Sequence, residues 1–484
     1  MFSTSTPHRI TALALIALIP VAAASAAEPT PLADPIATTI EKGDIRVAVV
    51  PFARAPMTTD PAQPVGTNKA HARIQYLKPI PDGSGRVMFS DVRGLLYVAS
   101  SDGSSVRTYL DLRTRDVDFF NVAFPNESGL LGFAFHPDFA DAGKPGFGKL
   151  YVGFSGAKKA VGDAPANPLM TYISGHQESV ISEWTTADPS ADVFEGTMRE
   201  LLRVPQFSPT HNVGTLAFNP TAGEGSSDYG MLYACLGDGG GANDPHEHGQ
   251  NPKTLLGTII RIDPLGGQGE AAYGIPGDNP FLGNSDAAPE VWAYGLRHAQ
   301  HFSWGPDGRL YINDIGQDQV EEVNLGIAGA NYGWRIREGT FATAYGLGTM
   351  RIGQVYPLPE DDGPFVYPVA QYDHGEGYAI GSGYVYQGDA IDALKGKYVF
   401  ADITLGRLFL IDTDGLEPGN PADIEELRLV FDGEERDLLE VAGFDNTYHG
   451  DMRADLRLGI DADGEIYLLT KGDGWVRKLV AAAD

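Results

Sequence analysis

The sequence predicts an all-β fold, and three observations favour a β-propeller. Glycine and proline are spread along the 484 residues, with 60 and 33 copies, and segments with a helical period are scarce. A unit of an apolar strand, a tight turn with Asp or Gly, and a strand with a tyrosine near its start recurs at irregular spacing. Small sheets repeated around an axis leave few exposed strand edges, and this is how a propeller accommodates such a pattern.

Six copies of this unit can be read along the chain, with loops of different length between them. A pair of β-sandwiches is the rival arrangement, but no linker divides the sequence. The copies are VMFSDVRGLLYVAS from Val87, GLLGFAFHPDF with KLYVGFSG from Gly129, GTLAFNP with MLYACLGDG from Gly214, HFSWGPDGRLYINDIG from His301, YVYQGDAIDALKGKYVFADITLGRLFLID from Tyr384, and GIDADGEIYLLTKGDG from Gly459.

The ends of the chain suggest export. Residues 1–27 have a polar start, an apolar run shorter than the ~20 residues of a membrane span, and small residues near its end, which is typical of a secretory signal peptide cut near Ala26 or Ala27. We expect a periplasmic or secreted protein without a membrane span.

Residues 28–484 are predicted to form a single propeller domain, with an N-terminal extension to about residue 51 and an insertion near 339–368. The strand IRVAVV from Ile45 is a candidate to close the last blade.

Composition narrows the possible partners. The formal net charge of -29 makes nucleic acid or anionic lipid a poor partner, while it suits calcium. Cys235 is the single cysteine and lies in an apolar run, so no intrachain disulfide can form.

The segment Thr210 to Gly241 contains the strongest local indication of chemistry. Two apolar runs separated by a turn-rich linker predict an antiparallel pair of strands. The residue before the first strand then lies near the residue after the second, which places His211 close to Asp238. A carboxylate that holds one imidazole nitrogen fixes the tautomer and strengthens the base. A turn-capping aspartate beside a surface histidine is the alternative.

Several longer strings resemble the glucose/sorbosone dehydrogenase family, whose members include soluble sugar dehydrogenases dependent on pyrroloquinoline quinone (PQQ). The resemblance covers most of Val87 to Asp412. The strings, in order, are ESGLLGFAFHPDF, HNVGTLAF, GDGGGANDPHEHGQNPKTLLGTIIRIDP, YGIPGDNPF, EVWAYGLRHAQHFSW and GQDQVEEVNLGIAGANYGW.

This resemblance implies a six-bladed propeller that binds PQQ and calcium at one end of its central channel. His211 resembles the general base that takes the proton of the sugar's anomeric hydroxyl, and Asp238 resembles its orienting carboxylate. Arg297 resembles the arginine that contacts the quinone. Arg407 is a second candidate cation at the same end.

The string GQDQVEEVN contains candidate calcium ligands. By the resemblance, the main-chain carbonyls of Gly316 and Gln317 face a calcium ion that bridges to the cofactor. Glu322, with the backbone of Tyr332 and a contribution from Glu321, resembles a second, structural calcium site. Turns rich in Asp, Glu and Gly are also common without a metal.

The sequence departs from the family pattern at two positions. Many members read RNPQ where this chain has His298 and Ala299 between Arg297 and Gln300. A lysine or arginine often follows the YVY strand, and Gln387 stands there as the cofactor-binding candidate. Losing a charge-assisted hydrogen bond to a carboxylate-rich cofactor costs about 1.5 to 3 kcal/mol. The aromatic rings of Tyr332, Trp334 and Trp304 could stack on a sugar or the cofactor, or pack inside blades.

Three functions follow from these features. The leading hypothesis is an exported quinoprotein dehydrogenase that oxidises an aldose at C1 to the lactone, with a small-molecule sugar as substrate and an external electron acceptor as partner. The second is a calcium-dependent propeller lactonase or hydrolase in which His211 activates water. The third is a non-catalytic propeller binding module, because a fold does not fix a function.

Overall fold

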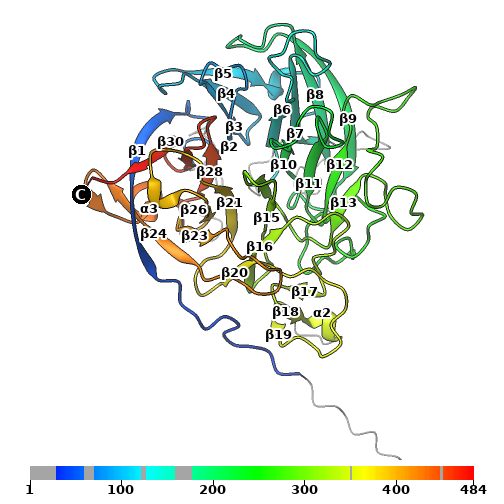
Figure 1. Cartoon of the computed structure of the whole chain (residues 1–484), viewed down its shortest axis with the longest axis vertical. Coiled ribbons are helices and arrows are strands. Elements are labelled where there is room, and N and C mark those ends of the chain that lie inside the picture. Colours follow the sequence, from blue (N-terminus) through cyan, green and yellow to red (C-terminus); the bar gives the residue numbers. More distant parts are fainter. Residues whose placement is uncertain are drawn as a thin grey trace, which may run out of the picture.

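A computed structural model describes residues 29–58, 70–120, 127–157, 177–348, 352–446 and 451–483. Regular structure in this part of the chain is almost entirely β, with two short helices, α2 (Ala344–Leu347) and α3 (Leu438–Ala442), and two 3-10 turns, Leu112–Thr114 and Asp392–Leu394. The sheets surround a common centre (Figure 1). The expected signal peptide, residues 1–27, lies outside the described residues.

Four sheets have four antiparallel strands each, in sequence order from the centre outward. They are β2 (Ile74–Pro79), β3 (Val87–Asp91), β4 (Leu95–Ala99) and β5 (Val106–Asp111); β6 (Leu130–Phe135), β7 (Lys149–Ala157), β8 (Gln177–Thr186) and β9 (Gly196–Pro205); β10 (Val213–Phe218), β11 (Leu232–Leu236), β12 (Thr258–Ile262) and β13 (Val291–Tyr294); and β14 (His301–Trp304), β15 (Leu310–Asp314), β16 (Val320–Leu325) and β20 (Ala370–Asp373).

A nine-stranded sheet supplies two further four-stranded units. One is β21 (Ile380–Val385), β22 (Lys397–Asp402), β23 (Leu408–Asp412) and β24 (Glu425–Phe431), and the other is β28 (Arg457–Ile460), β29 (Ile466–Leu469), β30 (Trp475–Ala481) and β1 (Lys42–Arg54); β25 (Glu434–Glu435) pairs with β24, and β26 (Phe444–Asn446) pairs with β27 (Asp451–Arg453).

The first strands of these six units pack against one another in a closed ring among the described residues: β2 on β6, β6 on β10, β10 on β14, β14 on β21, β21 on β28, and β28 on β2. The ring identifies the fold as a β-propeller and each unit as a blade. Inner strands approach closely, since a Cβ on Gly132 would lie 2.2 Å from the carbonyl oxygen of Gly214 on the next blade. Only glycine fits such a contact.

The last blade joins the two ends of the chain. Strand β1 pairs antiparallel with β30, where Val47 faces Ala481, and parallel with β24, where Val47 faces Leu429. In Figure 1 the blue β1 lies between the red β30 and the orange β24. Part of the expected N-terminal extension therefore belongs to the propeller, because its apolar residues complete a sheet and bury Val47 and Val49.

The segment expected as an insertion, 339–368, carries a small sheet of its own. Strands β17 (Arg337–Glu338), β18 (Phe341–Thr343) and β19 (Val355–Tyr356) form it, beside α2. It lies at the edge of the molecule, between β16 and β20 in the chain (Figure 1).

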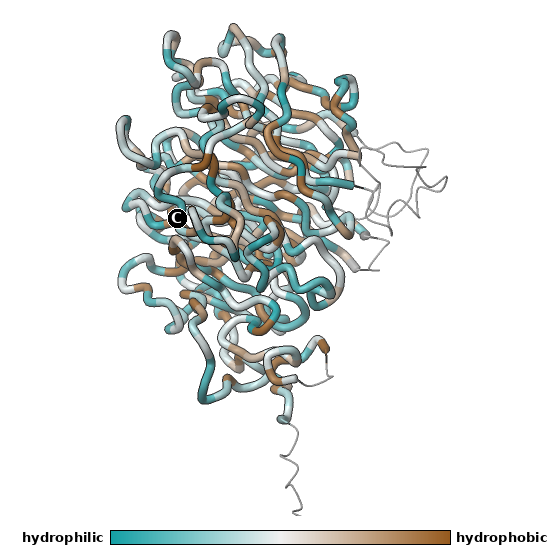
Figure 2. Tube along the Cα trace, turned by 90° about the vertical axis from the view of Figure 1, so that its right-hand side faces the viewer, coloured by the Kyte–Doolittle hydropathy of each residue, from teal (hydrophilic) through white to brown (hydrophobic). Residues whose placement is uncertain are grey.

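Hydrophobic segments gather in the interior strands and hydrophilic ones in outer loops (Figure 2). Cys235 is buried in β11, as its apolar surroundings predict.

Candidate active site

The hairpin of β10 and β11 brings His211 and Asp238 together. Val213 at the start of β10 pairs with Leu236 at the end of β11, so the flanking residues meet at one end of the blade. Nδ1 of His211 lies 2.6 Å from Oδ1 of Asp238. His211 has a φ of 55°, a left-handed conformation that is uncommon outside glycine and often marks a functional position. The structure thus forms the contact that the hairpin geometry predicts.

Asp238 is fully buried and held from three sides. Its Oδ2 accepts a hydrogen bond from Nε1 of Trp334 at 2.8 Å, and its Oδ1 accepts one from the backbone N–H of Gly240 at 2.8 Å. Burial alone would raise the pKa of Asp238, but the charge of His211 and its hydrogen bond bring that pKa below the usual range. The carboxylate therefore stays ionised and fixes the orientation of the imidazole.

A second imidazole lies against the first. The rings of His211 and His298 stack with centroids 4.8 Å apart and planes 21° apart. Glu127 joins both residues, since its Oε2 accepts the backbone N–H of His211 at 2.8 Å and lies 3.5 Å from Nδ1 of His298. Burial lowers the pKa of His298 to about 3, although Glu127 opposes the shift. His298 is therefore neutral near pH 7.

Glu127, His211 and His298 are the one trio of potential metal-ligating side chains gathered in the described part of the chain. Their geometry does not suit a metal ion. An imidazole coordinates in its ring plane, and nearly parallel stacked rings do not aim their nitrogens at a common point. Nδ1 of His211 is already bonded to Asp238. The trio fits a proton-handling site better than a metal centre.

Arg297 lies at the same place through both its backbone and its side chain. Its carbonyl oxygen accepts the N–H of Asp238 at 2.8 Å, and its guanidinium lies over the ring of Trp334 at 5.7 Å. The guanidinium donates to the carbonyl oxygen of Ile315 at 2.9 Å and to Oε1 of Gln317 at 3.3 Å. These contacts keep Arg297 beside the His211–Asp238 pair.

A cavity of about 880 Å³ opens next to this pair, and we call it the mouth cavity. It is lined by three arginines and one lysine against two carboxylates, in a protein whose net charge is -29. Burial holds the pKa of the lysine, Lys471, well below its usual range, so the excess of positive charge comes from the arginines. The arginines are Arg297, Arg453 and Arg457, and the carboxylates are Glu127 and Asp455.

Sequence reasoning missed Arg453, Arg457 and Lys471. Asp455 lies between them, with Oδ1 2.9 Å from Nε of Arg453 and Oδ2 3.9 Å from Nζ of Lys471. Burial would raise the pKa of Asp455, but Lys471 and the two arginines hold it far below its usual range. A usable signal was the blade register, because the residues before each inner strand meet at one end and Arg457 begins β28.

Arg407 does not reach the mouth cavity. It precedes the third strand of its blade, away from the axis, and its guanidinium donates to Oε2 of Glu426 at 2.6 Å and to Oε2 of Glu376 at 2.7 Å. A third bond goes to the carbonyl oxygen of Ile40 at 3.1 Å. The expectation that Arg407 faces the cofactor is corrected, because two carboxylates already use its charge.

Gln387 lies at the other end of the propeller. It follows β21, whose start faces the mouth cavity through Ala379, and it lines a different cavity with Lys78 and Trp304. The expectation that Gln387 contacts a cofactor beside Arg297 is therefore corrected. A strand that begins at one end of a blade finishes at the other, so a residue after β21 cannot share a site with residues that precede inner strands.

The predicted calcium ligands fall into two places. Gly316 and Gln317 line the mouth cavity. Glu322 is buried, where its Oε2 accepts from Nδ2 of Asn324 at 3.0 Å and it faces Asp314 across the β15–β16 pair. The hydroxyl of Tyr332 donates to the carbonyl oxygen of Leu325 at 2.7 Å. A second calcium site at Glu322 and Tyr332 stays a prediction.

The aromatic candidates separate in the same way. Trp334 is buried beside Asp238, whereas Trp304 lines the cavity at the opposite end.

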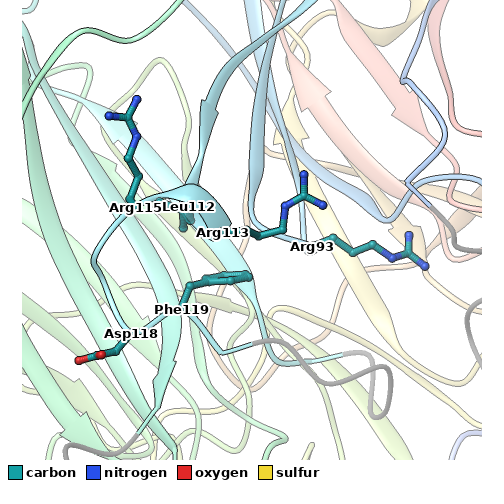
Figure 3. Close-up of a pocket in the computed structure, with 6 residues that line it drawn as sticks. All are labelled: Arg93, Leu112, Arg113, Arg115, Asp118 and Phe119. Carbon is teal, nitrogen blue, oxygen red and sulfur yellow. The ribbon is translucent and has the colours of Figure 1, made fainter.

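Figure 3 shows a third pocket, of about 420 Å³, on the first blade. Its three arginines are engaged. Arg93 donates to the hydroxyl of Thr58 at 3.1 Å, Arg113 forms an ion pair with Asp111, and Arg115 donates to the carbonyl oxygen of Phe194.

The sequence model of the family described as glucose/sorbosone dehydrogenase matches residues 75–474. This chain belongs to the glucose/sorbosone dehydrogenase family. It is 30% identical over 434 residues to HIPL1 protein of Arabidopsis thaliana, covering 81% of this chain and 59% of that protein. It is 25% identical over 324 residues to Hedgehog-interacting protein of Mus musculus, covering 66% of this chain and 40% of that protein. The chain thus spans less than two thirds of either relative.

A solved structure of the PQQ-bound form of aldose sugar dehydrogenase from Streptomyces coelicolor shares the fold. It superposes with a TM-score of 0.56 at 20% identity and covers 92% of this chain and 99% of that chain. None of the helices in the described ranges has the length and apolar character needed to cross a membrane.

Proposed function

We propose that this member of the glucose/sorbosone dehydrogenase family is an exported PQQ-dependent dehydrogenase that oxidises an aldose at C1 to the lactone. The observation that carries the proposal is the His211–Asp238 pair, 2.6 Å apart, at the edge of a cavity with an excess of positive charge. A base and a site for an anionic cofactor lie side by side, which is the combination that this oxidation requires.

The residues of the mouth cavity fit a tricarboxylate such as PQQ. Arg457 is buried, and its Nη2 donates to Oε1 of Gln300 at 2.8 Å while its Nη1 donates to the carbonyl oxygen of Leu456 at 3.0 Å. Its Nε has no hydrogen-bond partner among the described residues. A buried donor without a partner costs about 1 to 3 kcal/mol, so a carboxylate that accepts from Nε would stabilise the site. Arg297 and Arg453 supply further positive charge.

Each group of the His211 pair has a definite task in this proposal. Because Nδ1 of His211 is bonded to Asp238, Nε2 is the nitrogen that takes the proton of the anomeric hydroxyl. Asp238 holds the ring in this tautomer and stabilises the imidazolium that forms. Arg297 lies where a guanidinium can stabilise developing negative charge. When bound, PQQ supplies the acceptor for the hydride from C1, and an external acceptor later takes the electrons.

Calcium at Gly316 and Gln317 is part of the proposal. Both residues line the mouth cavity, and neither of their carbonyl oxygens accepts a hydrogen bond from a described residue. Main-chain carbonyls are ligands that Ca²⁺ accepts readily. These two residues would hold the ion, which would position the cofactor and act as a Lewis acid.

A non-catalytic binding module is the second candidate. Similarity to Hedgehog-interacting protein favours it, since the name of that relative describes an interaction and not a reaction. A binding module would not require an imidazole aligned by a buried carboxylate. A lactonase that uses His211 to activate water is a third possibility and would require calcium and the base but no excess of cations.

The experiment is an absorption titration of purified, calcium-loaded apoprotein with PQQ, followed by a panel of aldoses and an artificial dye acceptor. A bound-quinone spectrum that bleaches with sugar in the wild type, and does not bleach in His211→Ala, supports the dehydrogenase. A matched control is His136→Ala, because His136 lies in the cavity at the opposite end. If neither quinone nor sugar produces a change, the binding-module proposal replaces this one.

A further inference from the structure

A second cavity, of about 690 Å³, lies at the other end of the inner strands, and we call it the far cavity. His211 precedes β10 and lines the mouth cavity, whereas Phe218 ends β10 and lines the far cavity. Strand β14 behaves in the same way, with Gln300 before it and Trp304 at its end. The two cavities therefore occupy opposite ends of the propeller, and no residue lines both.

Lys78, near the end of β2, is the decisive side chain of the far cavity. Its Nζ lies 5.5 Å from the centroid of the Tyr384 ring, and no described carboxylate forms an ion pair with it. Burial lowers the pKa of Lys78 to about 8, so the amine is mostly charged at pH 7. Lys78 is half-buried. A partly desolvated ammonium without a counter-ion is unfavourable, and an anion bound beside it would relieve that cost.

The other titratable groups around the far cavity do not neutralise Lys78. The hydroxyl of Tyr384 lies 3.1 Å from Nε2 of His301, whose pKa burial holds well below the usual range, so that ring is neutral. Asp461 accepts from the hydroxyl of Tyr467 at 3.0 Å and lies 3.3 Å from Nζ of Lys478. Asp463 also lines the cavity but forms no ion pair with Lys78. The far cavity is thus lined by one lysine and two aspartates, and the lysine forms no ion pair with either aspartate.

The walls of the far cavity are aromatic and apolar. Phe135, Phe218 and Trp304 come from the ends of three successive inner strands, and prolines at positions 79, 81, 137 and 220 line the space between them. Trp304 is held edge-on against Tyr233 with ring centroids 5.1 Å apart. A cavity of several hundred Å³ with mostly apolar walls and a few fixed polar groups is the usual form of a small-molecule site.

We propose that the far cavity is a second ligand site, which binds a small aromatic carboxylate. The carboxylate would pair with Lys78, and the ring would lie among Phe135, Phe218 and Trp304. A single cation matches a monoanion better than a phosphate, which needs several donors. This site does not depend on the proposed dehydrogenase activity, because its residues are separate from the mouth cavity.

The test is calorimetric titration of the full protein with 2-naphthoate, alongside the neutral isostere 2-naphthalenemethanol, with tryptophan fluorescence as a second readout. We expect 2-naphthoate to bind at micromolar to low millimolar concentration. Lys78→Met should weaken it at least about tenfold, as loss of a charge-assisted hydrogen bond predicts. Lys78→Arg should keep most of the affinity, and the neutral alcohol should bind the wild type and Lys78→Met equally.

Controls separate the two cavities and the fold. Lys253→Met removes an exposed lysine that pairs with Asp286 and should leave binding unchanged. Arg457→Met should also leave it unchanged, because Arg457 lines only the mouth cavity. If Lys78→Met does not fold, the wild type still decides the question, since its affinity should fall above pH 8 as Lys78 loses its proton. Absence of binding, equal affinity in Lys78→Met, or loss of binding in Arg457→Met would overturn the proposal.

Discussion

The two ends of this propeller are built from the same six inner strands, yet they differ in the number of charged side chains and in how these side chains are paired. The mouth cavity concentrates cations, carboxylates and histidines that are tied to one another, as Asp238 is tied to His211 and Trp334. The far cavity carries aromatic walls, two aspartates and one lysine, and this lysine forms no ion pair with a described carboxylate. Residues that precede the inner strands therefore supply charged and proton-transferring groups, while residues at the ends of these strands supply apolar contacts.

The largest expected effect concerns the base of the mouth cavity. Asp238→Asn keeps the shape of the side chain but removes the charge that fixes the His211 tautomer. General acid–base catalysis contributes about 10² to 10⁴ in rate, so we expect kcat for aldose oxidation to fall at least about 100-fold. Steady-state kinetics with a dye acceptor measure it. An unchanged kcat and pH profile would mean that His211 is not the base.

Behind the mouth cavity, Glu322 should make stability fall as pH rises. Burial, together with the charge of Asp314, raises the pKa of Glu322 to about 8, so its stabilising contribution is complete in acid and is lost as pH rises towards 8. Glu322→Gln should therefore gain about 1 to 3 kcal/mol relative to the wild type between pH 5 and pH 9. Urea unfolding in metal-free buffer measures this difference.

The exposed Glu224, paired with Lys144, is the control for that experiment. Glu224→Gln should show the pH dependence of the wild type. A Glu322→Gln curve parallel to the wild type across the whole range would show that Glu322 is ionised in the folded protein.

A substitution at Trp334 tests how much its hydrogen bond to the Asp238 carboxylate stabilises the fold. Trp334→Phe removes the indole N–H that donates to Oδ2 of Asp238 and leaves a buried oxygen without that donor. We expect a loss of about 1 to 3 kcal/mol in the free energy of unfolding, measured by circular dichroism in urea. Trp475→Phe, on the partly exposed last strand, should cost less. Equal losses in the two variants would contradict the role given to the indole.

The smallest effect should come from the far cavity. Burial lowers the pKa of Lys78 to about 8, so the unfolded chain binds more protons than the folded chain above that pH, and wild-type stability should rise between pH 8 and pH 10. Lys78→Met should remove about 1 to 2 kcal/mol of that rise. Urea unfolding at the two pH values measures it. A rise of the same size in the variant would show that Lys78 is solvated.

Local geometry explains what the sequence predicts well. The recurring strand pairs predict the blades, and a single hairpin predicts the contact of His211 with Asp238 because both residues flank paired strands. Closure by an N-terminal strand also follows, since β1 is apolar and pairs with β30. These predictions depend on short-range pattern and strand direction.

The remaining parts of the site depend on contacts between distant blades. Trp334 reaches Asp238 from 96 residues away, and Arg457 reaches Gln300 from 157 residues away. Arg407 lies at the end of the propeller that carries the mouth cavity, but too far from the axis to line it. Gln387 lies at the opposite end. Strand direction predicts the end at which a residue lies, whereas the partner that uses its charge is visible only in the folded protein.

The most direct test of the central claim is PQQ binding to calcium-loaded wild type, Arg457→Met and Lys78→Met, measured side by side by absorption. We predict that the wild type and Lys78→Met bind with the same affinity and that Arg457→Met binds about 10-fold to 100-fold more weakly, as loss of a charge-assisted hydrogen bond implies. Absence of binding to the wild type, or equal binding to all three proteins, would contradict the assignment of the mouth cavity as the cofactor site.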